Sequence, residues 1–291
     1  MSNIIGSIGL GVMGGSYALH LLNNGYEVYG LDPNQKNAND FTLKGGKIAF
    51  DINELITKSD VVILSLPTVP IFKKVISEIK ENYTKSNSKI LIDMNTISFE
   101  DKLEAKIVLD RLNIDMIDAP VSGTGAQAKT KDLVVMSSGL EENINSCQDI
   151  FLSFARQNIY VGEFGNGIKF KLLANLLVTV HNTVTAEALL LGQKVGLNEN
   201  KIYEVLNAGA ASSVMLDKRM PLMIKKNYEP ATASMTIFLK DIEVIRQFIK
   251  SNNVISPTFE AAAKVYDDAK LNLPMTYDTA AVFEQLKLNN K

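Results

Sequence analysis

A glycine-rich turn near the start of the chain limits the possible folds more than any other feature. Residues 3–8 form a short apolar run typical of a buried strand, a turn from Gly9 to Gly14 follows, and residues 12–24 have a helical pattern. In such a G-x-G-x-x-G turn the first glycine permits the tight bend, the second lets a pyrophosphate approach the backbone, and the third lets the helix pack on the sheet. The helix N-terminus adds free N–H groups and a positive dipole end. We therefore expect a Rossmann-type unit that binds a dinucleotide through Gly9, Leu10, Gly11, Val12, Met13 and Gly14.

An acidic residue follows the second predicted strand. Residues 27–31 read as that strand, and Asp32 ends it. A carboxylate at this place accepts hydrogen bonds from the adenosine ribose hydroxyls and repels a 2′-phosphate. Lys36 lies close enough in sequence to attract such a phosphate. The sequence therefore favours NAD, with NADP as a possible cofactor.

The first half of the chain alternates strands with helices. Further apolar strands are expected at residues 60–67, 89–96, 114–120, 133–136 and 158–161, and helical patterns such as 70–83 and 99–112 separate most of them. This alternation predicts a doubly wound, mostly parallel α/β sheet. Ligands of such sheets bind beyond the carboxyl ends of the strands, where Leu66, Pro67, Thr96 and the 118–123 loop are expected.

The second half has a different pattern. From residue 165 onward no convincing strand is found, and helices are expected at 172–195, 198–207, 214–225, 232–252 and 256–270. The predicted organisation is a Rossmann-type domain at 1–164 and an all-helical substrate and oligomerisation domain at 165–291. No low-complexity linker separates them, so the long helix is expected to join the two domains and the active site to lie between them.

Composition excludes several classes of protein. The 291 residues are 46% hydrophobic and 21% charged with a formal net charge of −2, which gives no general attraction to nucleic acid or to an anionic membrane. No apolar run is long enough for a membrane span and no secretory signal is found. Cys147 is the only cysteine, so no internal disulfide is possible and a cytoplasmic location is expected. No cluster of residues has metal-ligand spacing. Lysines 73, 74 and 80 read as a solvated helix face.

Two polar residues stand one turn apart on the long apolar helix. Lys171 and Asn175 share a helical face. A partly desolvated lysine has a lowered pKa and can exchange a proton near neutral pH, so Lys171 is a candidate general acid and base. The competing interpretation of this feature alone is a lysine that extends from the helix to reach water.

A loop rich in glycine and hydroxyl groups follows the strand at 114–120. Successive N–H groups at Ser122, Gly123 and Thr124 can form an anion-binding nest, to which the Ser122 hydroxyl adds a donor. A substrate carboxylate suits such a site. An ordinary glycine-rich loop explains the same residues equally well.

Four separated segments together resemble the β-hydroxyacid dehydrogenase family, which includes 3-hydroxyisobutyrate dehydrogenase and tartronate semialdehyde reductase: residues 9–14, 118–123, 165–175 and 240–241. The resemblance spans nearly the whole chain. It implies that Lys171 is the catalytic proton donor and acceptor and that Asn175 contacts the substrate. It further implies that Ser122 and Gly123, with Thr124 beside them, bind the carboxylate, and that the cofactor is lined by Leu66, Pro67, Thr96 and Lys240.

The expected activity is hydride transfer between a nicotinamide cofactor and a short β-hydroxy acid or its semialdehyde. The main alternative is an NADPH-dependent reductase of small aldehyde acids such as tartronate semialdehyde, succinic semialdehyde, glyoxylate or sulfolactaldehyde. An imine reductase, a decarboxylating enzyme and a non-catalytic dinucleotide-binding module are less favoured. Thr124 and Lys131 depart from the glycines usual in the family that the chain resembles, so the pocket is expected to differ in shape. The helices of the second half contain more apolar residues than the core of one small domain needs, which predicts burial between subunits in a homodimer or homotetramer.

Overall fold

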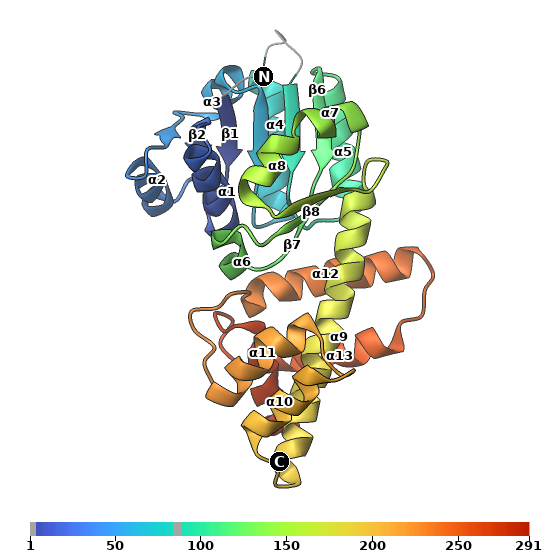
Figure 1. The fold of residues 1–291 in the computed structure, drawn as a ribbon. Coiled ribbons are helices and arrows are strands. Elements are labelled where there is room, and N and C mark those ends of the chain that lie inside the picture. The colour runs from blue at the N-terminus through green and yellow to red at the C-terminus, as the bar shows by residue number, and fades with distance from the viewer. Residues whose placement is uncertain (1–3, 84–88, 291) are drawn as a thin grey trace. The chain divides into compact units, whose positions relative to one another are not determined.

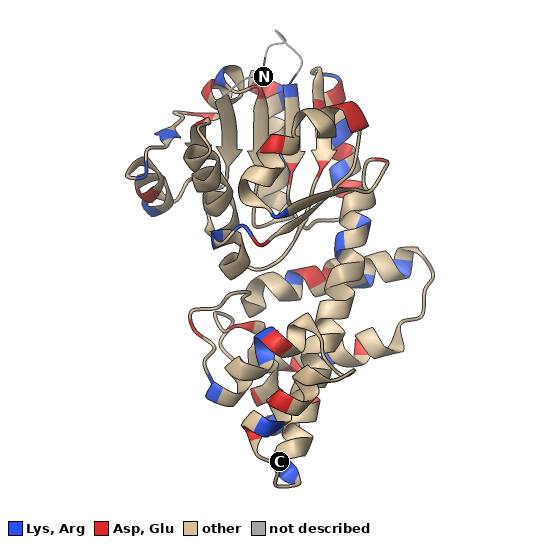
Figure 2. Ribbon diagram, viewed as in Figure 1, with Lys and Arg blue, Asp and Glu red and all other residues tan. Residues whose placement is uncertain are grey.

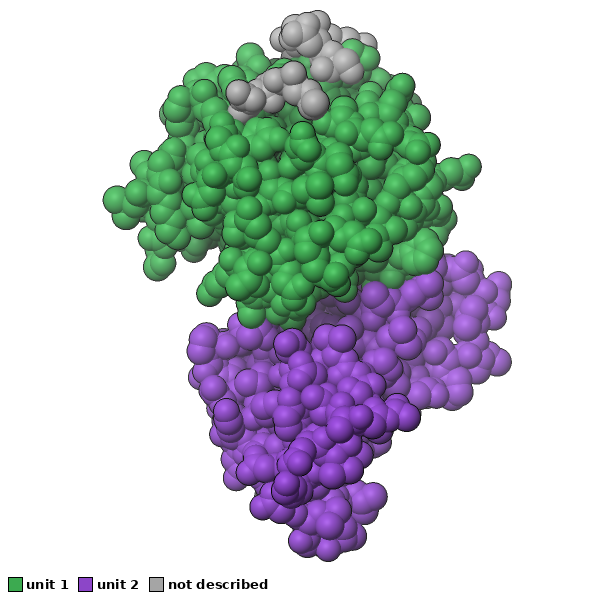
Figure 3. All heavy atoms as spheres, viewed as in Figure 1, with its two compact units in different colours: residues 1–171 green, residues 172–291 purple. Residues whose placement is uncertain are grey.

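The computed structural model describes residues 4–83 and 89–290. It contains two compact units, residues 1–171 and residues 172–291, which are coloured separately in Figure 3 and described in turn. The helices and strands keep the labels of Figure 1.

Unit 1 is built on a six-stranded parallel sheet with the order β3-β2-β1-β4-β5-β6. Consecutive strands cross over through helices, and the chain reverses direction across the sheet between β1 and β4. That switch point is where doubly wound sheets bind their ligands, beyond the carboxyl ends of the strands. The strands are β1 (Ile4–Ile8), β2 (Glu27–Leu31), β3 (Lys47–Ile48), β4 (Val61–Leu64), β5 (Lys89–Asp93) and β6 (Ile114–Asp118).

Helices cover both faces of this sheet (Figure 1). Side-chain caps start four of them, for example Asp51 at α3 and Thr68 at α4, because these oxygens accept from otherwise unpaired amides. One core cluster packs α1 on its face through Tyr17 and Leu21, and another includes Phe72 and Leu109. The helices are α1 (Val12–Asn23), α2 (Gln35–Thr42), α3 (Ile52–Lys58), α4 (Val69–Asn82) and α5 (Phe99–Asp110).

A second, three-stranded sheet follows the first. It pairs β7 (Val121–Ser122) antiparallel to β8 (Val134–Ser137) and β8 parallel to β9 (Gln157–Tyr160). The alternation of strands and helices predicted that 133–136 and 158–161 extend the parallel sheet, which is wrong. An isolated bridge pairs Asp118 at the end of β6 with Ser138 after β8, and β8 takes β7 and β9 as its strand neighbours. The helices here are α6 (Gly125–Lys129), α7 (Glu141–Ser146) and α8 (Gln148–Phe154).

The longest helix, α9, spans Asn166–Lys194, so it begins in unit 1 and continues into unit 2. Apolar periodicity predicted a start at 172. The helix begins earlier because Gly165, with φ of 90°, makes the turn and unit 1 supplies partners for the first amides.

Among its described residues, 172–290, unit 2 consists of helices and the loops that join them, with an isolated bridge between Ser234 and Asp278. Its core is formed by large side chains such as Phe259, Tyr266 and Phe283. A buried ion pair between Arg219 and Asp278 lies within it, with 2.7 Å between Nη1 and Oδ1. After α9 come α10 (Glu199–Ala208), α11 (Val214–Lys225), α12 (Met235–Ser251), α13 (Pro257–Asn272), the 3-10 turn η1 (Thr279–Ala281) and α14 (Val282–Asn289). Among the helices of the described residues, none has the length and apolar character that a membrane span requires.

Candidate active site

The glycine turn after β1 has the geometry that the sequence predicted. Gly9 has φ of 91°, and a Cβ there would lie 2.2 Å from the carbonyl oxygen of Ser65. A Cβ on Gly14 would lie 2.0 Å from the carbonyl oxygen of Gly9. Both glycines are therefore required by the close approach of α1 to the turn and to the end of β4.

Gly11 differs from its neighbours in the turn. It is the N-cap of α1, no side chain caps that helix end, and a Cβ placed on Gly11 would meet no atom within 4 Å. Helix α1 also carries no Lys, Arg, Asp or Glu, as Figure 2 shows. Free helix amides, open space and the absence of acidic side chains fit the pyrophosphate of a dinucleotide.

Asp32 lies at the end of β2 and is already engaged by the turn. Its Oδ2 accepts from the Leu10 amide at 2.7 Å and from Asn37 Nδ2 at 3.2 Å, and its Oδ1 accepts from the Asn34 amide at 2.8 Å. A carboxylate can accept about four hydrogen bonds, so Oδ1 retains capacity for one more donor such as a ribose hydroxyl. Lys36, the cation expected to attract a 2′-phosphate, pairs with Asp40 instead, with 2.6 Å between Nζ and Oδ2.

The segments after β4 and β5 are joined by a side chain. Asn95 is buried, and its Oδ1 accepts from the Leu66 amide at 2.5 Å. This bond fixes the turn of Leu66 and Pro67 against the segment that carries Thr96. All three predicted cofactor residues thus belong to neighbouring strand ends of the parallel sheet.

The predicted carboxylate loop connects β7 to α6. Gly123 has φ of 137°, and a Cβ there would lie 2.4 Å from the Leu133 side chain. Ser122 is exposed. The Thr124 amide, however, donates to Gln127 Oε1 at 3.0 Å. An anion can use the Thr124 amide only after displacing Gln127. Lys131, at a position where the resemblance implies glycine, adopts the left-handed φ of 59° that favours glycine.

Lys171 and Asn175 lie one turn apart on α9, as predicted. Lys171 is partly buried, whereas Asn175 is only 5% exposed. The Asn175 Nδ2 donates to Asp241 Oδ2 at 2.9 Å, and the other oxygen of Asp241 lies 2.8 Å from Lys240 Nζ. Helix α12 therefore brings Lys240 and Asp241 to the Asn175 amide within unit 2.

Sequence reasoning assigned no role to Asn95, Gln127 or Asp241, each of which holds a predicted site residue through its side chain. The only available signal was proximity in sequence, since Asp241 follows Lys240 and Asn95 precedes Thr96.

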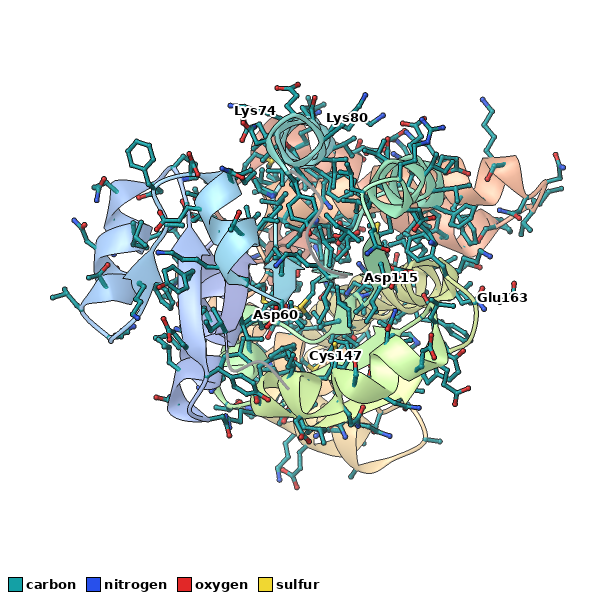
Figure 4. The ribbon with its side chains drawn as sticks, turned by 90° about the horizontal axis from the view of Figure 1, so that it is seen from above. Asp60, Lys74, Lys80, Asp115, Cys147 and Glu163 are labelled. Atoms are coloured by element: carbon teal, nitrogen blue, oxygen red, sulfur yellow. The ribbon has the colours of Figure 1, made fainter. Side chains whose placement is uncertain are left out.

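His20 and Cys147 are not part of the predicted site. His20 Nε2 lies 2.9 Å from the Ala128 carbonyl oxygen, which gives that ring a structural contact. Burial raises the pKa of the Cys147 thiol to about 11, so it is a poor nucleophile. Within residues 4–83 and 89–290, no three His, Cys, Asp or Glu side chains are grouped so as to hold a metal ion. The exposed Lys74 and Lys80 extend outward from α4 (Figure 4).

Comparison with known proteins identifies the family. The model of the NAD binding domain of 6-phosphogluconate dehydrogenase matches residues 4–162, and that of the NAD-binding domain of NADP-dependent 3-hydroxyisobutyrate dehydrogenase matches residues 165–286. The chain belongs to the β-hydroxyacid dehydrogenase family. It is an NAD(P)-dependent oxidoreductase, as its motifs predicted.

Relatives of this dehydrogenase differ in their substrates. The chain is 27% identical to 2-(hydroxymethyl)glutarate dehydrogenase of Eubacterium barkeri, over 91% of this chain and 89% of the relative. It is 26% identical to glyoxylate/succinic semialdehyde reductase 1 of Arabidopsis thaliana, over 99% of both. The structure of 3-hydroxyisobutyrate dehydrogenase from Mycobacterium tuberculosis with L-serine superposes with a TM-score of 0.89 at 24% identity, covering 99% of this chain and 100% of that chain. This likeness confirms the predicted fold class.

Proposed function

We propose that the enzyme transfers a hydride between a nicotinamide ring and the carbon of a short β-hydroxy acid or its semialdehyde, with Lys171 as general acid and base. The observation that carries this role is the place of Lys171 on α9. It is partly buried, and it stands one turn before an asparagine whose amide a buried carboxylate orients.

A bound dinucleotide would supply the hydride acceptor or donor. Unit 1 offers the open turn at Gly11, Asp32 for the ribose, and the segments with Leu66, Pro67 and Thr96 for the nicotinamide end. Lys240 is assigned to the region where cofactor and substrate meet. NAD is the favoured cofactor, since Asp32 repels a 2′-phosphate.

Lys171 exchanges a proton with the substrate oxygen in both directions of the reaction. During oxidation, neutral Lys171 accepts the proton of the hydroxyl group whose carbon loses the hydride. During reduction, the Lys171 ammonium stabilises the developing alkoxide and then donates its proton. Asn175 donates one Nδ2 hydrogen to Asp241, which fixes the orientation of the amide. Its Oδ1 can then accept from the substrate hydroxyl or from an ammonium, and its second Nδ2 hydrogen can donate.

The carboxylate of the substrate is assigned to Ser122, Gly123 and Thr124. A held carboxylate fixes the distance from the anion to the reacting carbon and so limits substrates by length. The Thr124 amide joins this site if Gln127 moves away from it. Residues 1–164 then bind the dinucleotide and hold the substrate carboxylate, and residues 165–291 supply Lys171 and Asn175 to the substrate and serve the assembly.

A lysine pair on α9 tests the assignment. We expect Lys171→Ala to lower kcat by about a thousandfold or more while NADH binding, measured by fluorescence titration, is retained. Lys169→Ala is the matched control, because Lys169 lies on the same helix turn but contacts Asn166 and the Phe99 ring instead. Near-normal turnover of Lys171→Ala would remove Lys171 from the mechanism.

The reverse physiological direction is the second candidate. The similarity to a glyoxylate/succinic semialdehyde reductase favours it. A rate screen of 3-hydroxyisobutyrate, 2-(hydroxymethyl)glutarate, succinic semialdehyde, tartronate semialdehyde, glyoxylate and sulfolactaldehyde with both cofactors would separate the two. Saturable NADH binding without turnover on any of these would favour a non-catalytic module.

A homo-oligomer completes the proposal. An exposed apolar stripe runs along the unit 2 part of α9, where a second copy of the chain would cover it: Leu177, Val184 and Leu191, with Val195 just past the end of the helix. A dimer and a tetramer both fit this stripe, and a cytoplasmic location stays a prediction from the single cysteine.

A further inference from the structure

A lysine with no exposed side-chain surface joins two strand ends in unit 1. Asp93 and Asp118 end β5 and β6 and are direct partners in the register of these strands, so their carboxylates would repel each other. Lys102, on the helix α5 that connects the two strands, lies between them. Its Nζ is hydrogen-bonded to Asp118 Oδ1 at 2.7 Å and makes an ion-pair contact with Asp93 Oδ2 at 2.9 Å. All three side chains are 0% exposed.

The lysine stays charged in this place. Burial opposes the charge of Lys102, but Asp118 and Asp93 outweigh it and raise its pKa. Burying three ionisable groups usually stabilises a fold no better than apolar residues of the same volume. The remaining contacts of the two carboxylates connect this ion-pair cluster to two neighbouring segments of unit 1.

One branch of contacts runs from Asp118 to the first turn of α9. The Ile168 amide donates to Asp118 Oδ2 at 2.7 Å, and the Gly167 amide donates to Ser138 Oγ at 2.9 Å. The Ser138 hydroxyl in turn donates to Asp118 Oδ2 at 3.1 Å. The first amides of a helix have no partners within it, and a carboxylate there complements the helix dipole. These contacts fix the turn that immediately precedes Lys171.

The other branch runs from Asp93 to the turn after β4. Asp93 Oδ1 accepts from the Asn95 amide at 3.1 Å and from Asn95 Nδ2 at 2.6 Å. The same Asn95 side chain accepts from the Leu66 amide. Leu66 lies in the segment assigned to the nicotinamide end of the cofactor.

We propose that Lys102, Asp93 and Asp118 form a buried ionic brace that holds Lys171 in register with the Leu66 turn. Lys102 is then a positioning residue for the proton transfer. This role rests on the function proposed above for Lys171. A displacement of about 1 Å in a reacting group can cost a hundredfold in rate, so the brace acts on catalysis without touching the substrate.

Ser138→Ala tests the branch to α9 without altering any charge. It removes the acceptor of the Gly167 amide and one donor to Asp118. We expect kcat to fall about tenfold while the NADH dissociation constant changes by less than about twofold. The solvent deuterium isotope effect on kcat should rise, because a displaced Lys171 makes proton transfer slower. Amide hydrogen exchange in the peptide covering 162–172 should become faster.

Lys102→Met with Asp93→Asn tests the centre of the brace, since the pair of changes removes one charge of each sign. Lys80→Met is the control, because Lys80 is an exposed lysine on the neighbouring helix α4. The double variant should show the same rise in isotope effect as Ser138→Ala, and the control should behave as wild type. Rates are measured with 3-hydroxyisobutyrate and NAD⁺ and with succinic semialdehyde and NADH, and the faster pair is used.

The outcomes separate the brace from the proposed function. Wild-type kcat, isotope effect and exchange in Ser138→Ala would overturn the brace, even if the double variant fails to fold. If Lys171→Ala retains turnover, the proposed function fails instead. Should neither probe substrate react, exchange at 162–172 still decides whether Ser138 and Asp118 hold the first turn of α9.

Discussion

Asp32, the residue proposed to select the cofactor, keeps one lone pair for a ligand. Three of its hydrogen bonds serve the protein itself, through Leu10, Asn34 and Asn37. The carboxylate is therefore held rigidly at the place proposed for the ribose. A rigid charge discriminates more strongly than a mobile one, because it cannot swing away from a 2′-phosphate.

Asp32→Ser should shift the preference toward NADPH. We expect the ratio of kcat/KM with NADPH to that with NADH to rise about a hundredfold, since the variant removes a like-charge repulsion worth about 2–3 kcal/mol. Steady-state rates with both cofactors measure the ratio. Adding Lys36→Met to the variant should reduce the gain, because Lys36 is the nearby cation that would meet the phosphate after leaving its exposed pair with Asp40. An unchanged ratio would mean that Asp32 does not face the ribose.

At the scale of elements, the turn from β1 to α1 contains one glycine that packing requires and another that lies beside the proposed pyrophosphate site. Gly14 is required by packing, since a Cβ would lie 2.0 Å from a backbone oxygen, whereas a Cβ on Gly11 would meet nothing. The same substitution at these two positions therefore has two different consequences.

Gly14→Ala should destabilise unit 1 by about 2 kcal/mol or more, because the backbone cannot move aside. Gly11→Ala should leave the melting temperature within about 2 °C of wild type and weaken NADH binding about tenfold, because the methyl group takes the space of the pyrophosphate. Thermal unfolding and fluorescence titration measure both effects. Tight NADH binding by Gly11→Ala would place the dinucleotide elsewhere.

Much of this architecture was predictable from local patterns. The turn at Gly9, the carboxylate at Asp32 and the apolar helix that carries Lys171 all lie within single segments, where spacing alone carries the information. The second sheet was missed because strand pairing depends on contacts distant in sequence. The start of α9 was missed because Asp118 and Ser138 supply its first acceptors from other elements. The burial of Lys102 could have been predicted from its spacing, since it shares the buried face of α5 with Ala105 and Leu109.

An ion pair holds together several elements of unit 2. Asp278 accepts from Arg219 on α11, from Thr232 and Ala233 before α12, and from Ala280 in η1. Burial alone would raise the pKa of Asp278, but Arg219 and these donors outweigh it and lower the pKa below the ordinary value of 3.8. The stabilisation is therefore present above pH 3.8 and is lost as the pH falls through the lower pKa of the folded protein.

Asp278→Asn should lower the free energy of unfolding at pH 7 by about 3–5 kcal/mol, because the Arg219 charge stays buried without its partner. The difference from wild type should shrink as the pH falls below 3.8, where the carboxylate itself becomes protonated. Urea unfolding followed by circular dichroism between pH 7 and pH 3 measures it. Asp268→Asn is the control, since Asp268 forms an exposed pair with Lys264 and should change stability by less than about 1 kcal/mol. A difference that is constant with pH would show that ionisation of Asp278 contributes nothing.

At the scale of the whole molecule, the two units differ in what they leave uncovered. Unit 1 encloses its parallel sheet between helices, whereas the unit 2 part of α9 exposes Val184 by 46% and Leu191 by 66%. Apolar side chains repeated along one helix are typical of a buried interface, and a stable dimer covers about 800 Å² on each partner.

Leu191→Glu should convert the assembly to a smaller species, because a second copy of the chain would bury the new carboxylates against apolar side chains. Size-exclusion chromatography with light scattering at about 10 µM protein measures the mass, a concentration at which an interface of standard size is occupied. Leu43→Glu is the matched control, since Leu43 is 85% exposed in unit 1, outside the α9 stripe, and should leave the mass unchanged. A wild-type protein that is already monomeric would exclude the interface. A variant that keeps the full mass would place the contact on another face. Because each outcome is a mass, the test holds whether or not the substrate has been found.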